Sequence, residues 1–532
     1  MPRFLPLPKS GFKRWLALIG YLLAGLILFV VMVVVSVVIL WKTSPNFQGW
    51  VFEKMMGGQT PPEERRDGAG LTASYSGFAP RADAVQTAAD IYRATNLWTF
   101  RFHFTAAEYD ALGPNRIASS SMNGGDQAGP VLRNPNAPRN GLAGVLGFDF
   151  PSSTALVEIG GRQFSNVAVR FKGNGTFLSG LGSYKKPLKI DLNKHEKTQD
   201  FGGRHTFNLG NLSADFTCLS DTLAYEFFRD AGVIAPRTAF ARVFHTIDGR
   251  TQDRLLGLYV LVENPDRLWA KESFQSEEIA LFKPVTTSPF TDLGQSWSNY
   301  AGIYDPKTKP TPAQTQRVID LAQLVSHSND AEFVQRIGEM VDLEQAAKFF
   351  ACEVLLANYD GILAQGQNYL TYHDPRSNHF GFIPWDLDHS WGEFPFIGKA
   401  DDREQSSITR PWVGENPFLQ RLWATPAFEK RYRAELQRLL DTLFTPDRLE
   451  RRIDELAAVI RPAIAEMPKS RQEKFEHAVS GQISNEIRDG KNPMDNSRPG
   501  WQLKRFIRAR ADHVRRQLAG EVEGITPPRM NF

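Results

Sequence analysis

The chain has 532 residues, of which 42% are hydrophobic and 23% are charged, and this composition excludes a largely disordered or collagen-like protein. The net charge is only +3, from 62 Lys and Arg against 59 Asp and Glu, which argues against a nucleic-acid partner. Two cysteines exclude a disulfide-stapled scaffold and a multi-cysteine zinc module.

The first predicted element is a single transmembrane helix over residues 15–41, a segment without any charged side chain. About 20 apolar residues span a bilayer as a helix, so this segment is long enough. Trp15 and Trp41 suit the two membrane interfaces. Residues 1–14 are more basic than the residues that follow the segment. We therefore expect a cytoplasmic N-terminus, an anchor in the lipid bilayer, and a main domain that is periplasmic or extracellular.

The rest of the chain divides by composition into a tether and two lobes. Residues 42–90 are rich in Gly, Pro and charge and predict a mostly irregular tether. Residues 91–265 are strand-rich, with a long loop at 113–146, and residues 266–520 are mainly helical around one hairpin, before a tail at 521–532. Strands followed by helices indicate an α+β protein with two lobes.

Hydrophobic periodicity places the individual elements. Alternation of period two predicts strands at 97–104, 155–159, 167–171, 188–192, 238–246 and 254–263, and a hairpin of 368–373 with 379–384. Spacing of three and four residues predicts a helix over 219–230, which ends near Gly232. A second helix begins after Asp342, which can cap it, and runs to Ala357.

The segment 358–392 carries the most specific pattern of polar residues. Asp360 follows a predicted helix end, Asn368 begins the hairpin, and Asp386 and Asp388 end it. If the strand continues through Asp386 and Asp388, both carboxylates point the same way, as oxygen ligands for Mg²⁺ would. A separate aspartate such as Asp360 can act as a base in phosphoryl transfer. The alternative is that these are loop aspartates that cap turns and helices.

A glycine-containing segment lies between two predicted strands. Gly173, Asn174, Gly175 and Thr176 follow the first strand, and glycine lets backbone N–H groups approach phosphate oxygens. The same glycines would also suit an ordinary hairpin turn.

A lysine on the second strand of that pair is the next candidate. Lys186 is in phase with Leu188 and Ile190, and a lysine on an apolar face needs an anionic partner or an escape to solvent. Because Pro187 can disturb the phase, Lys189 is the second choice. Glu226 on the following helix can pair with this lysine, or it is simply solvated. Glu263 ends an apolar strand that can join the two lobes.

The chain contains, in this order, a glycine loop, a strand lysine, a helix glutamate, a linking strand, and then Asp, Asn and Asp. Protein kinases have the corresponding residues in the same order. The HRD string is absent, no DFG string follows Asp360, and Asn368 lies eight residues after Asp360 rather than five. The order therefore indicates an atypical kinase.

Six segments in the same order resemble the spore coat protein CotH kinase family. They are RFKGNGT, SYKKPLKIDL, LSDTLAYEFFRDAGVIAPR, GLYVLVE, NYDGILAQGQNYLTY and IPWDLDHSWG, within residues 95–520. The resemblance implies an atypical protein-kinase-like fold and phosphorylation of Ser or Thr on proteins, with ATP and Mg²⁺ or Mn²⁺ as cofactors. The membrane segment and the 113–146 insertion are not part of the spore-coat pattern.

The resemblance also implies roles for single residues. Asp360 takes the role of the catalytic aspartate, and Lys186 that of the lysine on the nucleotide phosphates, with Glu226 as its partner. Asp386, or Asp388 in its place, holds the metal together with Asn368. The resemblance assigns the remaining nucleotide contacts to Arg170, Lys172, Gly173, Asn174, Gly175, Thr176 and Glu263.

The leading hypothesis is a membrane-anchored atypical kinase that acts on a protein acceptor outside the cytoplasm. Two alternatives remain. One is a non-catalytic, kinase-like scaffold of the cell envelope, because the supply of ATP outside the cytoplasm is in doubt. The other keeps the fold and transfers the adenylyl group instead of the γ-phosphoryl group.

Overall fold

The computed structural model describes residues 11, 60–116, 148–173, 175–180, 182–482 and 501–529. The predicted membrane segment 15–41, most of the predicted 113–146 loop, and Asn174 lie outside these residues. In the described part of the chain, no helix is both long and apolar enough to cross a bilayer.

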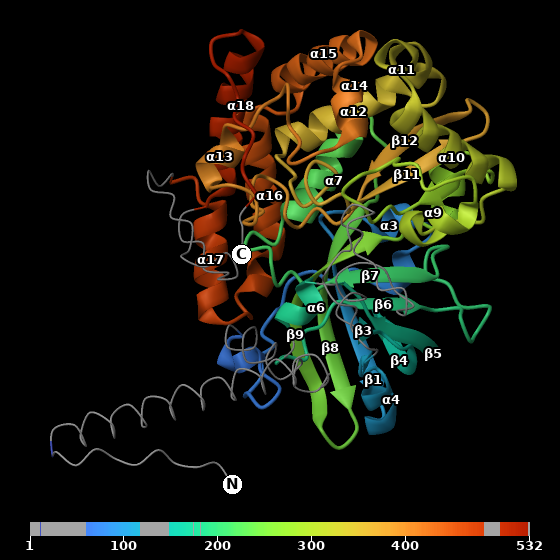
Figure 1. The fold of residues 1–532 in the computed structure, drawn as a ribbon. Coiled ribbons are helices and arrows are strands. Elements are labelled where there is room, and N and C mark those ends of the chain that lie inside the picture. Colours follow the sequence, from blue (N-terminus) through green and yellow to red (C-terminus); the bar gives the residue numbers. More distant parts are fainter. Residues whose placement is uncertain are drawn as a thin grey trace.

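Seven strands close into a barrel in the order β1-β4-β5-β6-β7-β9-β8 (Figure 1). Their bounds are β1 Leu97–Phe104, β4 Ser153–Ile159, β5 Arg162–Phe171, β6 Leu188–Asp191, β7 Thr206–Gly210, β8 Thr238–Ile247 and β9 Thr251–Glu263. Neighbouring strands are antiparallel except β1 and β8, which pair in parallel with Leu97 opposite Phe240. The strand predictions are confirmed, but their closure into a barrel was not predicted.

The barrel has its own hydrophobic core, because alternate residues of each strand point inward. Phe100, Val157, Val169 and Ile190 are among the completely buried side chains of this core. Four short elements lie in the segments that connect the barrel strands: α4 Ala106–Ala111, β2 Asn115–Arg116, β3 Phe148–Asp149 and α6 Gly175–Ser179.

The second half of the chain is mainly helical and surrounds a three-stranded sheet. The sheet consists of β10 Ala280–Phe282, β11 Tyr369–Asp374 and β12 His379–Pro384, in the order β10-β11-β12. The helices are α8 Arg267–Phe274, α9 Trp297–Tyr304, α10 Pro312–His327, α11 Asp330–Arg336, η3 Ile337–Glu339, α12 Leu343–Leu355, α13 Ala400–Glu404, α14 Pro417–Trp423, α15 Pro426–Thr442, α16 Pro446–Ile464, α17 Lys469–Val479 and α18 Leu503–Leu518. The Asp342 side chain accepts hydrogen bonds from the N–H groups of Glu344 and Gln345, as predicted for the cap of α12.

Helix α7 (Ser220–Asp230) belongs to the first half of the sequence but packs into the core of the second half. Figure 1 shows it between the barrel and the helices of the second half. Gly232, at φ 84°, follows its end in the left-handed conformation that glycine adopts easily. The structure is therefore a mixed α+β fold in which one helix connects the two halves.

Residues 60–92 form a strap that lies against both halves of the molecule; it contains η1 Pro62–Glu64, η2 Ala82–Ala84 and α3 Ala88–Ile91. Buried Glu64 pairs with Arg471 at 3.0 Å, and the N–H groups of Ser74 and Tyr75 each donate to Glu466 at 2.7 Å. We predicted a tether over residues 42–90. Its described part is mostly irregular, but it is packed on the domain.

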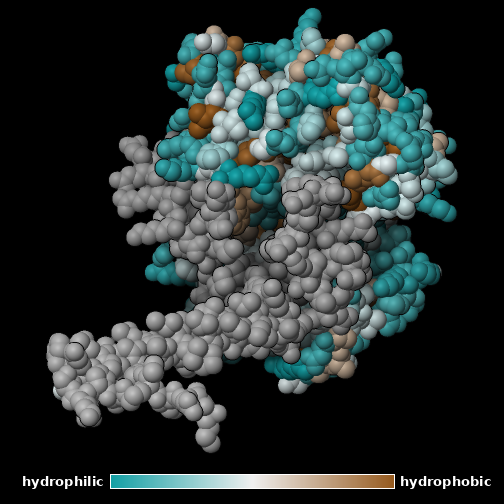
Figure 2. Space-filling model, viewed as in Figure 1, coloured by the Kyte–Doolittle hydropathy of each residue, from teal (hydrophilic) through white to brown (hydrophobic). Residues whose placement is uncertain are grey.

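The visible described surface is mostly hydrophilic, with scattered hydrophobic side chains (Figure 2). Within the described residues, the exposed large hydrophobic side chains are Phe78, Leu156, Val334 and Ile525. They come from distant parts of the chain, and single exposed apolar residues of this kind are normal on a folded protein.

Candidate functional site

A cavity of about 500 Å³, here called the cationic cavity, lies between the barrel and the second half of the chain. Arg170, Lys172 and Gly173 line it from the end of β5, and Lys189 lines it from β6. The second half contributes positive and negative side chains and one aromatic ring: Lys283, Lys307, Asn368, Trp385 and Asp386. The cavity therefore collects residues from segments that are far apart in the sequence.

Burial shifts the pKa of several cations in this cavity. The pKa of Lys189 is lowered to about 7 by burial and by the like charges of Arg170, Lys172 and Lys307. Burial lowers the pKa of Lys283 to about 8, although Asp386 acts in the opposite direction. These cations are buried and repel one another, and both effects disfavour their charged forms. A bound polyanion would offset both effects, so the cavity favours a polyanionic ligand.

Asp360 and Asn368 are held together at the edge of this cavity. The Asn368 Nδ2 donates to the Asp360 Oδ2 at 2.8 Å and to its carbonyl oxygen at 3.1 Å. Asn368 has φ 59°, a left-handed conformation that asparagine tolerates better than most residues. Because its amide nitrogen is used by Asp360, its amide oxygen is the atom available to a cation.

Asp386 and Asp388 do not share a strand face, which corrects our prediction. Strand β12 ends at Pro384, and Asp386 has φ 58°, which turns the chain out of the extended conformation. Asp386 lines the cationic cavity with Asn368. Asp388 instead lies with Asp360 and His389, and one ligand atom of each of these three lies within 4.8 Å of the others.

His389 is the counter-charge of this carboxylate group. Burial lowers its pKa, but Asp388 and Glu393 outweigh this effect and raise it to about 10. Its Nδ1 lies 2.6 Å from a Glu393 oxygen. Burial raises the pKa of Asp360 to about 7, with the His389 charge acting against the shift.

Asp221 on α7 completes the acidic part of the site and was not predicted. It lines a small acidic cavity of about 40 Å³ with Asp386 and Asp388, beside the cationic cavity. Burial, followed by the charges of Asp388 and Asp386, raises its pKa well above the ordinary value. A divalent cation would favour the ionised form of these carboxylates, so the donor set fits Mg²⁺ or Mn²⁺.

Helix α7 also holds the 386–388 loop by direct hydrogen bonds. The Asp386 N–H donates to the Tyr225 hydroxyl at 2.9 Å, and the Leu387 N–H donates to the Asp221 Oδ1 at 2.8 Å. The Trp391 Nε1 donates to the Ser220 carbonyl at 3.3 Å. The position of the acidic residues is therefore set by a helix more than 150 residues earlier in the chain.

Lys186 lies outside the cationic cavity, and the second choice, Lys189, lines it. Lys186 precedes Pro187 in a turn; its Nζ donates to the Gly180 carbonyl and lies 4.9 Å from the Phe177 ring centroid. Strand β6 starts only at Leu188, and its buried face carries Leu188 and Ile190. Lys189 is on the other face, so the lysine that lines the cationic cavity is the second choice.

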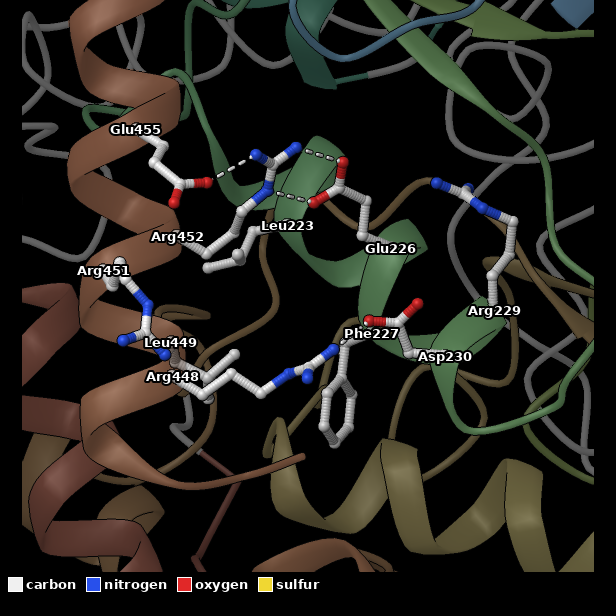
Figure 3. A pocket seen from close by; sticks show the side chains of 10 residues that line it. All are labelled: Leu223, Glu226, Phe227, Arg229, Asp230, Arg448, Leu449, Arg451, Arg452 and Glu455. Carbon is white, nitrogen blue, oxygen red and sulfur yellow. Dashed lines mark hydrogen bonds and ion pairs between the residues drawn. The ribbon is translucent and has the colours of Figure 1, made fainter. Parts of the chain in front are cut away.

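Glu226 and Glu263 also lie elsewhere. Glu226 forms a bidentate pair with Arg452 at 2.8 and 2.9 Å, so it is not the partner of a site lysine (Figure 3). Glu263 is completely buried and pairs with Arg204 and Arg237. The residues after Glu263 reach the cavity instead, and Asn264 accepts a hydrogen bond from the Lys189 Nζ at 3.1 Å.

The glycine segment adopts a turn followed by a short helix. Gly173 lines both cavities at φ 77°, and a Cβ added there would lie 2.6 Å from the Thr176 Oγ1. Gly175 begins α6, and Thr176 lines the small acidic cavity. An ordinary hairpin turn is thereby excluded, because the two strands are joined through a helix.

Comparisons with known proteins identify relatives of this chain. A family model described as CotH kinase protein matches residues 169–514. Inner spore coat protein H of Bacillus subtilis (strain 168) is 25% identical over 284 residues, which cover 52% of this chain and 74% of that protein. The crystal structure of a Helicobacter pylori proinflammatory kinase, CtkA, aligns with 54% of this chain and 94% of its own, at 9% identity and a TM-score of 0.20, too low to support a fold argument. The family model covers more than half of the sequence, and the chain belongs to the CotH kinase protein family.

Proposed function

We propose that this chain transfers the γ-phosphoryl group of ATP to a Ser or Thr hydroxyl of a protein acceptor. The observation that carries the proposal is the cationic cavity, which places buried lysines beside Asp386, Asn368 and Asp360. Membership of the CotH kinase protein family supports a phosphotransferase.

Different residues of the chain bind the nucleotide, hold the metal and accept the proton. Arg170, Lys172 and Lys189 bind the nucleotide phosphates, and Trp385 forms part of the cavity wall between Lys172 and Lys283. Asp386 and the Asn368 amide oxygen would hold Mg²⁺ or Mn²⁺, which supplies positive charge to the phosphates. Asn368 also orients the carboxylate of Asp360.

In the transfer step, the acceptor hydroxyl oxygen forms a bond to the γ-phosphorus while the bond between that phosphorus and the β–γ bridging oxygen breaks. ADP is the leaving group, and the hydroxyl proton passes to Asp360. A pKa raised by burial improves the ability of Asp360 to accept this proton near neutral pH.

The direct test incubates the full chain with Mg²⁺ and ATP labelled at the α- or the γ-phosphate, alone and with a Ser-rich protein. We expect transfer of the γ-label only. Asp360→Asn should reduce the rate about 10²–10⁴-fold while nucleotide affinity changes little, because the substitution is nearly isosteric and Asp360 acts in the chemical step.

Three outcomes would contradict the proposal in different ways. Transfer of the α-label would identify an adenylyl transferase. Tight nucleotide binding without transfer would favour the non-catalytic scaffold, and the absence of nucleotide binding would exclude the assignment of the cationic cavity.

We further propose that residues 15–41 anchor the chain in the lipid bilayer, with the catalytic domain periplasmic or extracellular. The apolar, uncharged sequence and the basic N-terminus support this arrangement. Protease treatment of intact cells and of spheroplasts tests it: a domain that stays protected until the inner membrane is opened would contradict the orientation.

A further inference from the structure

Another cavity lies behind α7, on the side away from the 386–388 loop. It has a volume of about 440 Å³ and is lined by residues of α7 and α16 (Figure 3). We call it the α7–α16 cavity. Its lining has no residue in common with that of the cationic cavity. The volume is in the range of pockets that bind small ligands or single side chains.

Positive charge exceeds negative charge in this cavity. Three carboxylates line it, against four guanidinium groups: Arg229, Arg448, Arg451 and Arg452. Leu223, Phe227 and Leu449 form an apolar wall. This combination suits a ligand that has an anionic head and a short carbon chain.

Two of the four arginines already bind carboxylates of α7 or of their own helix. Arg452 pairs with Glu226 and Glu455, each at 2.8 Å, and Arg448 pairs with Asp230 at 2.8 Å. The Arg452 side chain is 29% exposed and Arg448 is 47% exposed, so both remain accessible from the cavity.

The other two arginines are not neutralised in this way. Among the described residues, Arg451 has no hydrogen-bond or ion-pair partner, and the Arg229 guanidinium donates to the Pro236 carbonyl rather than to a carboxylate. Both residues line the same cavity as Arg448 and Arg452 (Figure 3). Guanidinium groups bind phosphate oxygens in bidentate pairs, with a geometry that a lone lysine does not offer.

We propose that the α7–α16 cavity binds a phosphate monoester group. The group could belong to a small free ester or to a phosphorylated side chain of a protein. Such a ligand binds Arg448, Arg451 and Arg452 and competes with Glu226 and Asp230 for them. It would therefore contact the helix that also holds the 386–388 loop.

The test is a calorimetric titration of the purified full chain with O-phospho-L-serine, inorganic phosphate and a phosphoserine-containing peptide, in separate arms. A Lys189→Gln background weakens phosphate binding in the cationic cavity. In this background we expect binding to persist and Arg451→Gln to weaken it about tenfold, as for the loss of a charge-assisted contact. Arg461→Gln is the matched control, because Arg461 is on the same helix but pairs with Glu476 outside the cavity.

The proposal is overturned if the Lys189→Gln protein binds no phosphate probe, if Arg451→Gln leaves the affinity unchanged, or if Arg461→Gln weakens it equally. Tighter binding of the peptide than of phosphoserine would identify a phosphorylated side chain, and equal binding a small ester; both support the proposal. If the wild-type chain does not bind ATP, only the proposed function is contradicted. Failure of the proposed function and failure of this phosphate site are therefore distinguishable.

Discussion

Lys189 lies in an electrostatic environment that makes its charge depend on its ligand. Burial and three neighbouring cations lower its pKa to about 7 in the free protein. A bound polyphosphate restores the charged form, because opposite charge favours ionisation. If the chain binds a nucleotide as proposed, this binding is linked to proton uptake at neutral pH.

This linkage predicts that ATP affinity falls as the pH rises from 6.5 to 8.5. Below the pKa the lysine is already charged, whereas above it each bound nucleotide must also bind a proton, which costs up to about tenfold in affinity per pH unit. Calorimetry at several pH values measures the slope. Lys189→Gln should reduce both the affinity and the slope, and Lys186→Gln, in the neighbouring turn, should retain the slope; equal slopes in all three proteins would contradict the assignment.

Glu353 provides a second residue-scale prediction, on stability. It is completely buried on α12, and burial raises its pKa to about 8, although Asn358 donates to it at 3.0 Å. Between the ordinary pKa and about 8, the native state holds a proton that the unfolded chain releases, so this residue lowers the free energy of unfolding as pH rises.

The gain in the free energy of unfolding from Glu353→Gln, relative to the wild type, should therefore be about 2–4 kcal/mol larger at pH 8.5 than at pH 5. The reason is that glutamine needs no proton to remain neutral. Urea denaturation of both proteins at the two pH values measures the difference. A stability difference between the two proteins that is the same at both pH values would show that Glu353 is ionised in the native state.

At the scale of elements, α7 positions the 386–388 loop. Tyr225→Phe removes the hydroxyl that accepts the Asp386 N–H and leaves a buried donor without a partner. We expect a loss of about 1–3 kcal/mol in the free energy of unfolding and weaker binding of Mn²⁺ or MgATP, measured by denaturation and calorimetry.

Tyr259→Phe is the matched control for this substitution. Tyr259 is equally buried, in the barrel, but its hydroxyl has no hydrogen-bond partner among the described residues. Its removal should leave stability and metal affinity nearly unchanged. If the two variants lose metal affinity equally, the hydrogen bond to Asp386 does not position the loop.

The same scale shows what could be predicted from the sequence. Helices α7 and α12 and most barrel strands were predicted within a few residues, because their apolar periodicity is strong. Lys186 was preferred to Lys189 because it is in phase with Leu188 and Ile190, and these two residues do form the buried face of β6, whereas the lysine that lines the cavity is on the opposite face. Lys283 was missed because it lies in no recognisable motif. Asp221 lies in one of the six segments that resemble the family, but the segment does not show which of its polar residues faces the site, and only the tertiary packing brings both residues to the cavities.

At the scale of the whole molecule, the strap of residues 60–92 connects both halves. Buried Glu64 pairs with Arg471 on α17, and Glu466 accepts hydrogen bonds from the strap while it also pairs with Arg242 on β8. A chain that starts at residue 91 therefore lacks partners of half-buried Arg471 and of buried Glu466.

We predict that deletion of residues 1–90 lowers the free energy of unfolding by about 3 kcal/mol or more relative to deletion of residues 1–59, because it leaves Arg471 without its buried partner. Thermal and urea unfolding measure the difference. Glu64→Gln in the longer fragment should reproduce part of the loss. Equal stability of the two fragments would show that the strap contributes nothing to the fold.

The parallel pairing of β1 with β8 has a consequence for the synthesis of the protein. Strand β1 is the first barrel strand to leave the ribosome, but one of its two edges has no partner until β8 has been made. Such a non-local contact slows folding, and an unpaired edge invites association with other chains. The barrel therefore cannot close during translation before β8 and β9, up to residue 263, are free of the ribosome, and we expect a chaperone that covers this edge until then to favour correct folding.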